Sequence, residues 1–230
     1  MRSPTTPNRR PTAAARGAGA RRPPSEVRII AGLWRRTRLP VLDAEGLRPT
    51  SDRVRETLFN WLGQRLDGYR CLDLFAGSGA LGFEAASRGA AQVVLVERNR
   101  RVAAQLLDNR TRLAALNLEV VEGDALRIAA SWPAGSIDLL FLDPPFGSDL
   151  LAAALPLADR LMTANGVIYV ESSLPLIESN GAAGLSAVEA QAVGGAPAAS
   201  LLACPRGWRI DRQGKAGAVC FHLLRRENRE

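Results

Sequence analysis

The most informative stretch for the fold is Cys71-Leu72-Asp73-Leu74-Phe75-Ala76-Gly77-Ser78-Gly79-Ala80-Leu81-Gly82. An apolar run leads into Gly-x-Gly-x-x-Gly, a spacing typical of a strand that turns tightly into a helix. Glycines at the turn let the backbone bend sharply or approach a ligand closely. The stretch therefore predicts the first strand–helix unit of an α/β sheet that binds a nucleotide-like molecule.

Strand and helix patterns alternate after this stretch, which predicts parallel strand pairing in an open α/β sheet. A closing hairpin is expected over 207–226, with its turn near Gln213-Gly214. Residues 174–204 are rich in Ala and Gly and give no clear pattern. Strands are predicted at 71–75, 91–97, 118–124, 136–143 and 166–173, and helices at 80–89, 99–116 and 150–162, with a kink or a break at Pro156 in the last.

The segment before the glycine turn has its own pattern. Residues 26–41, EVRIIAGLWRRTRLPV, predict two short strands around a glycine-containing turn. Pro49 ends the extended part, and Thr50 or Ser51 can cap a helix in which apolar residues recur at helical spacing. We therefore expect an N-terminal hairpin and a helix, 26–68, joined to a core, 69–230.

The charge is concentrated at the N-terminus. The net charge is +7, but residues 1–25 contain six arginines and no acid, and without them 24 basic residues face 23 acidic ones. This Arg/Pro/Ala-rich segment lacks apolar periodicity and is predicted to be a disordered tail, with 26–230 as a single domain. No apolar run is long enough for a membrane span. The cysteines, three and widely spaced, suggest no disulfide framework or zinc site and favour a cytoplasmic protein.

The glycine turn alone fits NAD and S-adenosylmethionine about equally well. Glu97 ends the next strand, where a carboxylate can accept hydrogen bonds from ribose hydroxyls. Asp73 would repel a pyrophosphate but would attract the ammonium of a methionine moiety. Asp124 ends the third strand, where it can accept from an adenine amine, although it could equally cap the next helix. These acids at successive strand ends favour S-adenosylmethionine over NAD.

The fourth strand ends in Asp143-Pro144-Pro145-Phe146. The prolines fix two φ angles and remove two N–H donors, which leaves a rigid corner of acceptors. The complement of such a corner is a planar exocyclic amine, and Phe146 offers a ring on which a base can stack. Methyl transfer to that amine would depend on positioning and electrostatics, and it requires no metal.

With these motifs the chain resembles the bacterial small-subunit ribosomal RNA guanine-N2 methyltransferases of the RsmD type. Four segments carry the resemblance: RIIAGLWRRTRLPV, LRPTSDRVRETLFNWL, LDLFAGSGALGFEAASRGA with VVLVERN, and IDLLFLDPPF. The first two are specific, whereas the glycine turn and Asp-Pro-Pro-Phe occur in many amino-methyltransferases. The resemblance implies a Rossmann-like class I methyltransferase fold, with a mainly parallel seven-stranded sheet, one antiparallel strand and an N-terminal β-hairpin.

The resemblance also implies the activity and the site. It implies methylation of one guanine N2 in 16S rRNA, within the 30S subunit, by a cytoplasmic enzyme that is a monomer. It makes Asp143, Pro144, Pro145 and Phe146 the residues that hold the target base. The predicted cofactor residues are Asp73, Phe75, Gly77, Ser78, Gly79, Glu97, Arg98, Asp124 and Ala125. The predicted RNA-facing residues are Arg35, Arg36, Arg38, Arg48, Arg53 and Arg55.

Three alternatives remain at this stage. An NAD-dependent oxidoreductase would need a hydride-handling pair, and Tyr69, Tyr169, Lys215 and His222 show no familiar spacing. An adenine-N6 methyltransferase acting on DNA or RNA would use the same glycine turn and the same Asp-Pro-Pro-Phe. A ribosome-assembly factor without activity would keep the fold, but such a copy is expected to have lost Asp143 or the glycines.

Overall fold

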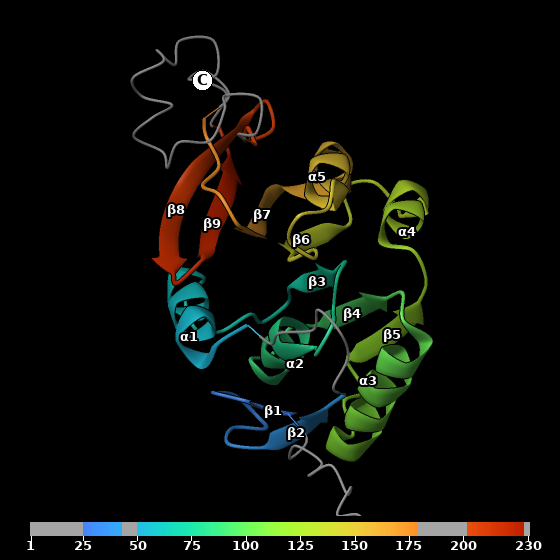
Figure 1. The fold of residues 1–230 in the computed structure, drawn as a ribbon. Helices are drawn as coiled ribbons and strands as arrows, with labels where there is room; N and C mark the ends of the chain where they lie inside the picture. Colours follow the sequence, from blue (N-terminus) through green and yellow to red (C-terminus); the bar gives the residue numbers. More distant parts are fainter. Residues whose placement is uncertain (1–24, 43–49, 179–201, 228–230) are drawn as a thin grey trace, which may run out of the picture.

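The computed structural model describes residues 25–42, 50–178 and 202–227. They form one seven-stranded sheet, a separate two-stranded hairpin and five helices (Figure 1). The strands of the hairpin are β1 (Ser25–Arg28) and β2 (Arg38–Val41), and those of the sheet are β3 (Arg70–Asp73), β4 (Gln92–Glu97), β5 (Leu118–Glu122), β6 (Ile137–Leu142), β7 (Met162–Ser172), β8 (Trp208–Ala216) and β9 (Val219–Arg226). The helices are α1 (Asp52–Trp61), α2 (Ala80–Ser87), α3 (Arg100–Leu113), α4 (Ala125–Ser131) and α5 (Leu150–Leu161).

The strand order across the large sheet is β5-β4-β3-β6-β7-β9-β8. Strands β5, β4, β3, β6 and β7 pair in parallel, and β9 is antiparallel to both of its neighbours. The predicted mainly parallel sheet with one antiparallel strand is therefore confirmed. From β3 the chain proceeds first to β4 and β5 and then to the other side through β6. The carboxyl ends of β3 and β6 thus flank the switch point, where open α/β sheets bind ligands.

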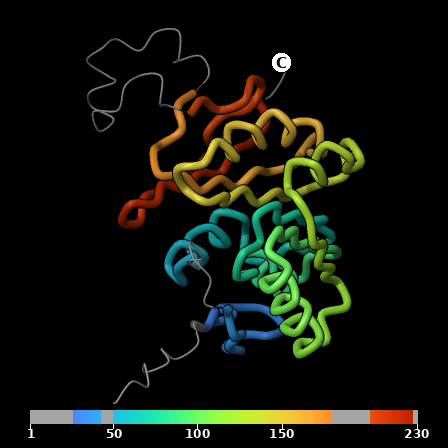
Figure 2. The backbone as a smooth tube through the Cα atoms, turned by 45° about the vertical axis from the view of Figure 1, so that its right-hand side comes forward, coloured from blue at the N-terminus to red at the C-terminus, as the bar shows by residue number. Residues whose placement is uncertain are grey.

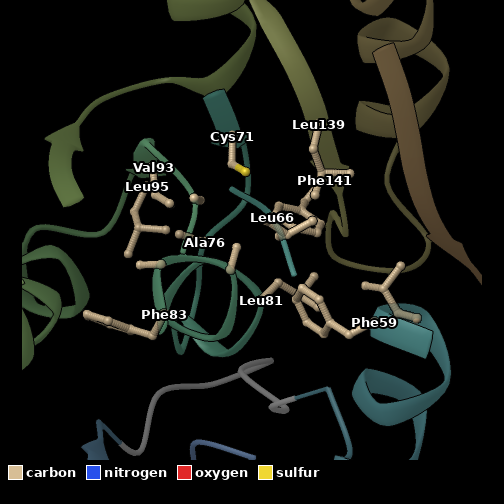
Figure 3. Packing of buried hydrophobic residues seen from close by; sticks show 14 of the residues in the cluster. Phe59, Leu66, Cys71, Ala76, Leu81, Phe83, Val93, Leu95, Leu139 and Phe141 are labelled. Atoms are coloured by element: carbon tan, nitrogen blue, oxygen red, sulfur yellow. The ribbon is translucent and has the colours of Figure 1, made fainter. Parts of the chain in front are cut away.

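Helices cover both faces of the sheet, since parallel strands buried on two sides need cover on each. Along β3, β4 and β6 the buried side chains point to opposite faces of the sheet and form two hydrophobic cores, one on each face. One core, drawn in Figure 3, joins Cys71 and Leu95 to Phe59 of α1 and Phe83 of α2. The other joins the opposite faces of the same strands to α4 and α5. The face covered by α1, α2 and α3 is the one that also carries the hairpin.

Gly82 determines how closely α2 approaches the sheet. A Cβ atom added there would lie 2.0 Å from Leu95 Cδ2, so the helix could not pack as it does with any larger residue. Gly79 has a φ of 77° and an added Cβ would lie 2.7 Å from the Phe83 ring. The third glycine of the motif is therefore a packing residue, and the second is required by both the turn and the core.

The hairpin predicted for residues 26–41 is present, and α2 lies between it and the sheet (Figure 1). In the tube view of Figure 2 the blue hairpin lies against the green segments, away from the red C-terminal strands. Val27 and Val41 pack on Ala80 at the start of α2. The Asn109 side chain of α3 donates to the Pro40 carbonyl at 3.0 Å. The hairpin is thus an additional layer on the helical face that borders the glycine turn.

One local prediction is wrong. The closing hairpin was expected to turn near Gln213-Gly214, but β8 continues through both residues and the turn lies at Gly217-Ala218, between the paired residues Ala216 and Val219. Gly217 takes a φ of 61°, which suits the first central position of a two-residue hairpin turn. Gly214 is instead a strand position at which an added Cβ would lie 2.4 Å from the Phe221 ring.

Among the described residues, no helix has the length and apolar character needed to cross a membrane. The three cysteines are buried and unpaired. His222 is also buried, and its Nε2 accepts a hydrogen bond from the Leu176 N–H at 3.2 Å. Burial lowers the pKa of His222 to about 4, so this imidazole is neutral at pH 7. These groups are parts of the core.

Candidate active site at the carboxyl ends of β3, β6 and β7

Three carboxylates gather at the switch point of the sheet. Asp73 ends β3, Asp143 follows β6, and Glu171 lies near the end of β7. Asp73 and Glu171 follow Cys71 and Tyr169 by two residues, so they face the same side of the pleated sheet as that core. Leu142 pairs with Val170, which places Asp143 beside Glu171 in the next register position. The sheet therefore brings together acids that are 28 and more residues apart in sequence.

Asp73 is fully enclosed, with 1% of its surface exposed. Its Oδ1 has no hydrogen-bond partner among the described residues. Burial raises the pKa of this carboxyl to about 7, and the charge of Glu97 adds to the shift. A buried carboxylate oxygen without a donor is costly unless a ligand supplies one. The ammonium of S-adenosylmethionine is a ligand group of that kind, so the residue present fits the cofactor.

Glu97 organises the glycine turn. Its Oε2 accepts from the Gly77 N–H at 3.0 Å and its Oε1 from the Asn99 N–H at 2.6 Å. The carboxylate is partly exposed at the end of β4, with lone pairs left for further donors. It therefore joins the first βα turn to the second, and it lies where the sequence predicts a ribose contact.

The remaining predicted cofactor residues lie around these two turns. Asp124 is the N-cap of α4, and its Oδ1 accepts from the Arg127 N–H at 3.0 Å. The helix-capping alternative for this acid is therefore realised, and a second oxygen is still present on the side chain. Phe75 is partly buried, Ser78 and Ala125 are buried, and Arg98 is exposed.

The Asp-Pro-Pro-Phe corner follows β6 directly. Asp143 is partly buried, and its Oδ2 accepts a hydrogen bond from the Thr50 hydroxyl at 3.4 Å. Pro144 is buried, whereas the Phe146 ring is 47% exposed. The Pro145 carbonyl accepts from the Ser148 hydroxyl at 2.7 Å and keeps a second lone pair. The corner thus offers the Asp143 carboxylate and an open aromatic face.

Glu171 was not foreseen from the sequence. It is 4% exposed, and the Tyr169 hydroxyl donates to its Oε1 at 2.9 Å. Burial raises the pKa of Glu171 and, together with the charges of Glu171 and Asp73, raises the pKa of Asp143 well above its ordinary value. The sequence does contain a signal for Glu171, because this acid lies near the end of the apolar run GVIYVESS, just as Asp73 and Asp143 lie at the ends of their apolar runs.

The predicted RNA-facing arginines divide into three groups. Arg35, Arg36 and Arg53 are exposed, as is Arg38, which pairs with Glu26 at 3.2 Å. Arg48 lies outside the described residues. Arg55 does not face solvent, contrary to the prediction: it is 1% exposed and pairs with the buried Glu84 at 3.2 Å. On α1 it occupies the inward side, next to Val54 and Leu58.

The sheet order, the glycine turn and the buried acid beside it define a class I methyltransferase that uses S-adenosylmethionine. The family model described as conserved hypothetical protein 95 matches residues 27–201. The chain belongs to this family. It is also similar to proteins named ribosomal RNA small subunit methyltransferase D, which gives the family a more specific description.

Two such relatives are similar over most of their lengths. The ribosomal RNA small subunit methyltransferase D of Escherichia coli strain K12 is 40% identical over 204 residues, which cover 88% of this chain and 91% of the relative. The Haemophilus influenzae protein of the same name is 48% identical over 154 residues, 64% of this chain and 79% of the relative. A solved structure, the putative methyltransferase yhhF from Escherichia coli, superposes with a TM-score of 0.69 at 37% identity and covers 89% of this chain and 100% of its own.

Proposed function

We propose that this chain transfers the methyl group of S-adenosylmethionine to the exocyclic N2 amine of one guanine in 16S rRNA, within the assembled 30S subunit. The observation that carries the proposal is the Asp143-Pro144-Pro145-Phe146 corner beside Asp73 at the switch point. The names of the relatives support ribosomal RNA of the small subunit as the substrate.

The target base enters at the corner that follows β6. A base must leave its stack to reach such a site. The exposed Phe146 ring supplies a surface on which the extruded base can stack. The Asp143 carboxylate is the acceptor for an N2–H bond, which orients the amine and draws electron density toward nitrogen. Specificity for an amine follows, because a carbonyl at that position would meet a carboxylate without a proton between them.

The cofactor, when bound, supplies an electrophilic methyl group on a positively charged sulfur. Asp73 would hold its ammonium, and Glu97 and Asp124 would hold its ribose and adenine, together with Phe75, Gly77, Ser78, Gly79, Arg98 and Ala125. As the new nitrogen–carbon bond forms and the carbon–sulfur bond breaks, the nitrogen must lose one proton. Asp143 is placed to accept it, because the neighbouring acids Asp73 and Glu171 raise its proton affinity.

Exposed arginines of the hairpin and α1 would contact the RNA backbone. Arg35, Arg36, Arg38 and Arg53 are exposed on the described residues, and Arg48 is proposed with them. Guanidinium groups pair well with phosphates, and several together give a salt-dependent affinity. The tail predicted for residues 1–25 ends one residue earlier, because Ser25 belongs to β1 and pairs with Val41. We further propose that residues 1–24, which lie outside the described residues, are a tail separate from a single domain, and that the chain acts as a cytoplasmic monomer.

The test is transfer of label from methyl-labelled S-adenosylmethionine to three acceptors: unmethylated 30S subunits, protein-free 16S RNA and duplex DNA. Chromatography of the nucleosides identifies the product. N2-methylguanosine from 30S subunits is the expected result. N6-methyladenine would overturn the proposed target in favour of the adenine enzyme. Cofactor binding without transfer to any acceptor would favour the assembly factor instead.

A further inference from the structure

Thr50 connects the corner after β6 to the N-terminal part of the chain. Its hydroxyl donates to Asp143 Oδ2 at 3.4 Å, across 93 residues of sequence. Among the described residues it is the one side chain that donates to this carboxylate. Thr50 immediately precedes the N-cap of α1, but the cap itself is Ser51, whose Oγ accepts from the Val54 N–H at 3.4 Å. The Thr50 hydroxyl is therefore not needed to begin the helix.

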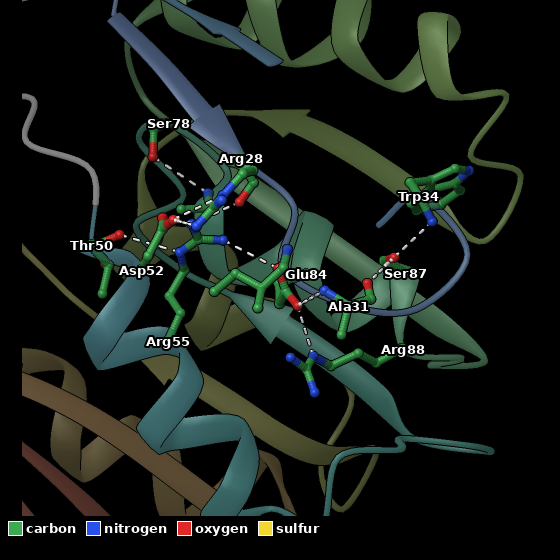
Figure 4. Close-up of polar contacts among 12 residues, drawn as sticks. Arg28, Ala31, Trp34, Thr50, Asp52, Arg55, Ser78, Glu84, Ser87 and Arg88 are labelled. Atoms are coloured by element: carbon green, nitrogen blue, oxygen red, sulfur yellow. Dashed lines mark hydrogen bonds and ion pairs between the residues drawn. The ribbon is translucent and has the colours of Figure 1, made fainter. Parts of the chain in front are cut away.

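The backbone of Thr50 is held by Arg55. The Arg55 Nε donates to the Thr50 carbonyl at 3.3 Å. The same guanidinium donates to Glu84 of α2 at 3.2 Å and to the Arg28 carbonyl of β1 at 2.8 Å (Figure 4). Because Arg55 is 1% exposed and its planar group has several fixed partners, it has little freedom to move. The hairpin, α2 and Thr50 thus share one anchor.

The groups that face Asp143 explain why the Thr50 contact affects the ionisation of this carboxyl. From β3 it is faced by Asp73, from β7 by Glu171 and Tyr169, and from the start of α1 by Thr50. The two neighbouring acids oppose ionisation of Asp143, and the Thr50 hydroxyl favours it. Burial also raises the pKa of Glu171, and the Tyr169 and Thr50 hydroxyls oppose that increase.

We propose that Thr50 is a positioning residue for methyl transfer: its hydroxyl, fixed through Arg55, aims the Asp143 carboxylate at the target amine. This inference rests on the function proposed above. It also assigns a role to the hairpin beyond RNA contact, since the hairpin and Thr50 are held by the same guanidinium. The docked hairpin is then part of what keeps the active-site acid in place.

Thr50→Val removes the hydroxyl and keeps the shape, and Thr50→Ser keeps the hydroxyl. The matched control is Thr57→Val on α1, whose hydroxyl donates to the Arg53 carbonyl at 2.9 Å, outside the site. We expect Thr50→Val to lower kcat by about 10- to 100-fold at pH 7. KM for the RNA and Kd for S-adenosylmethionine should change by less than about threefold, as Thr50 aims Asp143 without holding either ligand. Thr50→Ser and Thr57→Val should keep kcat within about threefold of the unmodified chain.

The pH dependence of kcat distinguishes a positioning role of Thr50 from a structural one, because a structural role would leave this dependence unchanged. Transfer needs the ionised Asp143, and the Thr50 hydroxyl stabilises that form. Its removal should therefore shift the acidic limb of log kcat against pH to higher pH in Thr50→Val alone. The same shift should appear without any RNA, as a higher pKa of the Asp143 carboxyl in a carbon-13 NMR titration of the cofactor-free chain.

The outcomes separate this inference from the proposed function. If the unmodified chain transfers no methyl group to any acceptor, the proposed function fails, and the NMR titration still tests whether Thr50 acts on Asp143. If the unmodified chain is active and Thr50→Val matches Thr57→Val in both kcat and pH profile, Thr50 is not a positioning residue. A melting curve identifies a folding defect in Thr50→Val, and in that case Thr50→Ala is measured in its place.

Discussion

Among the described residues, the buried acid Glu84 with its partners and the buried acids of the active site have opposite surroundings. Glu84 of α2 is 0% exposed, yet four donors saturate its carboxylate: the Ile30 and Ala31 N–H groups, Arg55 and Arg88. Asp73, equally buried, has an oxygen without any partner among the described residues. Burial of an acid therefore does not by itself mark a site. An acid with complete partners holds the fold together, and an acid with a missing partner indicates where a ligand supplies it.

The Glu84 group joins three separate parts of the chain. Its carboxylate binds the hairpin backbone through two N–H groups at 2.8 and 3.0 Å and binds α1 through Arg55. The Arg88 guanidinium, in addition, lies 4.5 Å from the centre of the Phe59 ring. In the active-site group, by contrast, the donors to Asp143 and Glu171 within the described parts of the chain are two hydroxyls, those of Thr50 and Tyr169. Hydroxyl donors leave the charge of the carboxylates uncompensated, which keeps their proton affinity high.

The largest expected effect is on catalysis. Asp143→Ala removes the acceptor of the target amine, and general-base contributions are typically about 10²- to 10⁴-fold. We therefore expect methyl transfer to fall about 1,000-fold, while Kd for S-adenosylmethionine changes by less than about threefold. Single-turnover label transfer and calorimetric titration measure the two quantities. Near-full activity in this variant would contradict the role assigned to the Asp-Pro-Pro-Phe corner.

The second largest effect is on the free energy of unfolding and concerns Glu84. Glu84→Gln leaves Arg88 buried without a counter-charge and leaves Arg55 with Asp52 as its remaining acidic partner, which together costs about 3 kcal/mol of the free energy of unfolding. Urea denaturation followed by circular dichroism measures it. The control is Glu119→Gln at an exposed position of β5, which should change stability by less than about 0.5 kcal/mol. Equal stability of the two variants would remove the contrast between a structural acid and a surface acid.

Asp73→Asn and Glu84→Gln should change the thermal stability of the cofactor-free chain in different directions. Loss of the carboxylate should weaken S-adenosylmethionine binding about 30-fold, since a charge-assisted hydrogen bond to the ammonium is lost. Burial raises the pKa of Asp73 to about 7, so ionisation of this group destabilises the cofactor-free fold as pH rises from the unfolded value of 3.8. At pH 8 the cofactor-free variant should therefore melt at the same or a higher temperature, unlike Glu84→Gln. A large fall in melting temperature would instead make Asp73 a structural residue.

The smallest expected effect is the pH dependence of cofactor binding. The ammonium binds the ionised form of Asp73, and that form is lost as pH falls through about 7. Between pH 8 and pH 6 the affinity for S-adenosylmethionine should therefore drop about tenfold. Calorimetric titrations across this range measure the drop, and Asp73→Asn should flatten it. A flat profile in the unmodified chain would mean that another group holds the ammonium.

Much of the site could be predicted from the sequence because its residues follow strands directly. A run such as IDLLFLD must be a buried strand, and the residue after it must emerge at the carboxyl edge of a parallel sheet. Asp73, Glu97 and Asp143 are found at that edge for this reason. The hairpin and the cap of α1 were likewise local features, and both are present. The turn expected near Gln213-Gly214 failed because a glycine can serve strand packing as well as a turn.

Sequence patterns alone were enough to predict the class of fold, the order of the parallel strands and three of the acids at their ends, Asp73, Glu97 and Asp143. These properties depend on short-range patterns of apolar residues, glycine and proline. Which charged residues are buried, and which residues they pair with, became known from the three-dimensional packing. Arg55 looked like a surface arginine beside Arg53, yet it contacts Glu84, 29 residues away, and Thr50 reaches Asp143 across 93 residues. Such pairings depend on how helices and hairpin pack in three dimensions, and no local pattern records them.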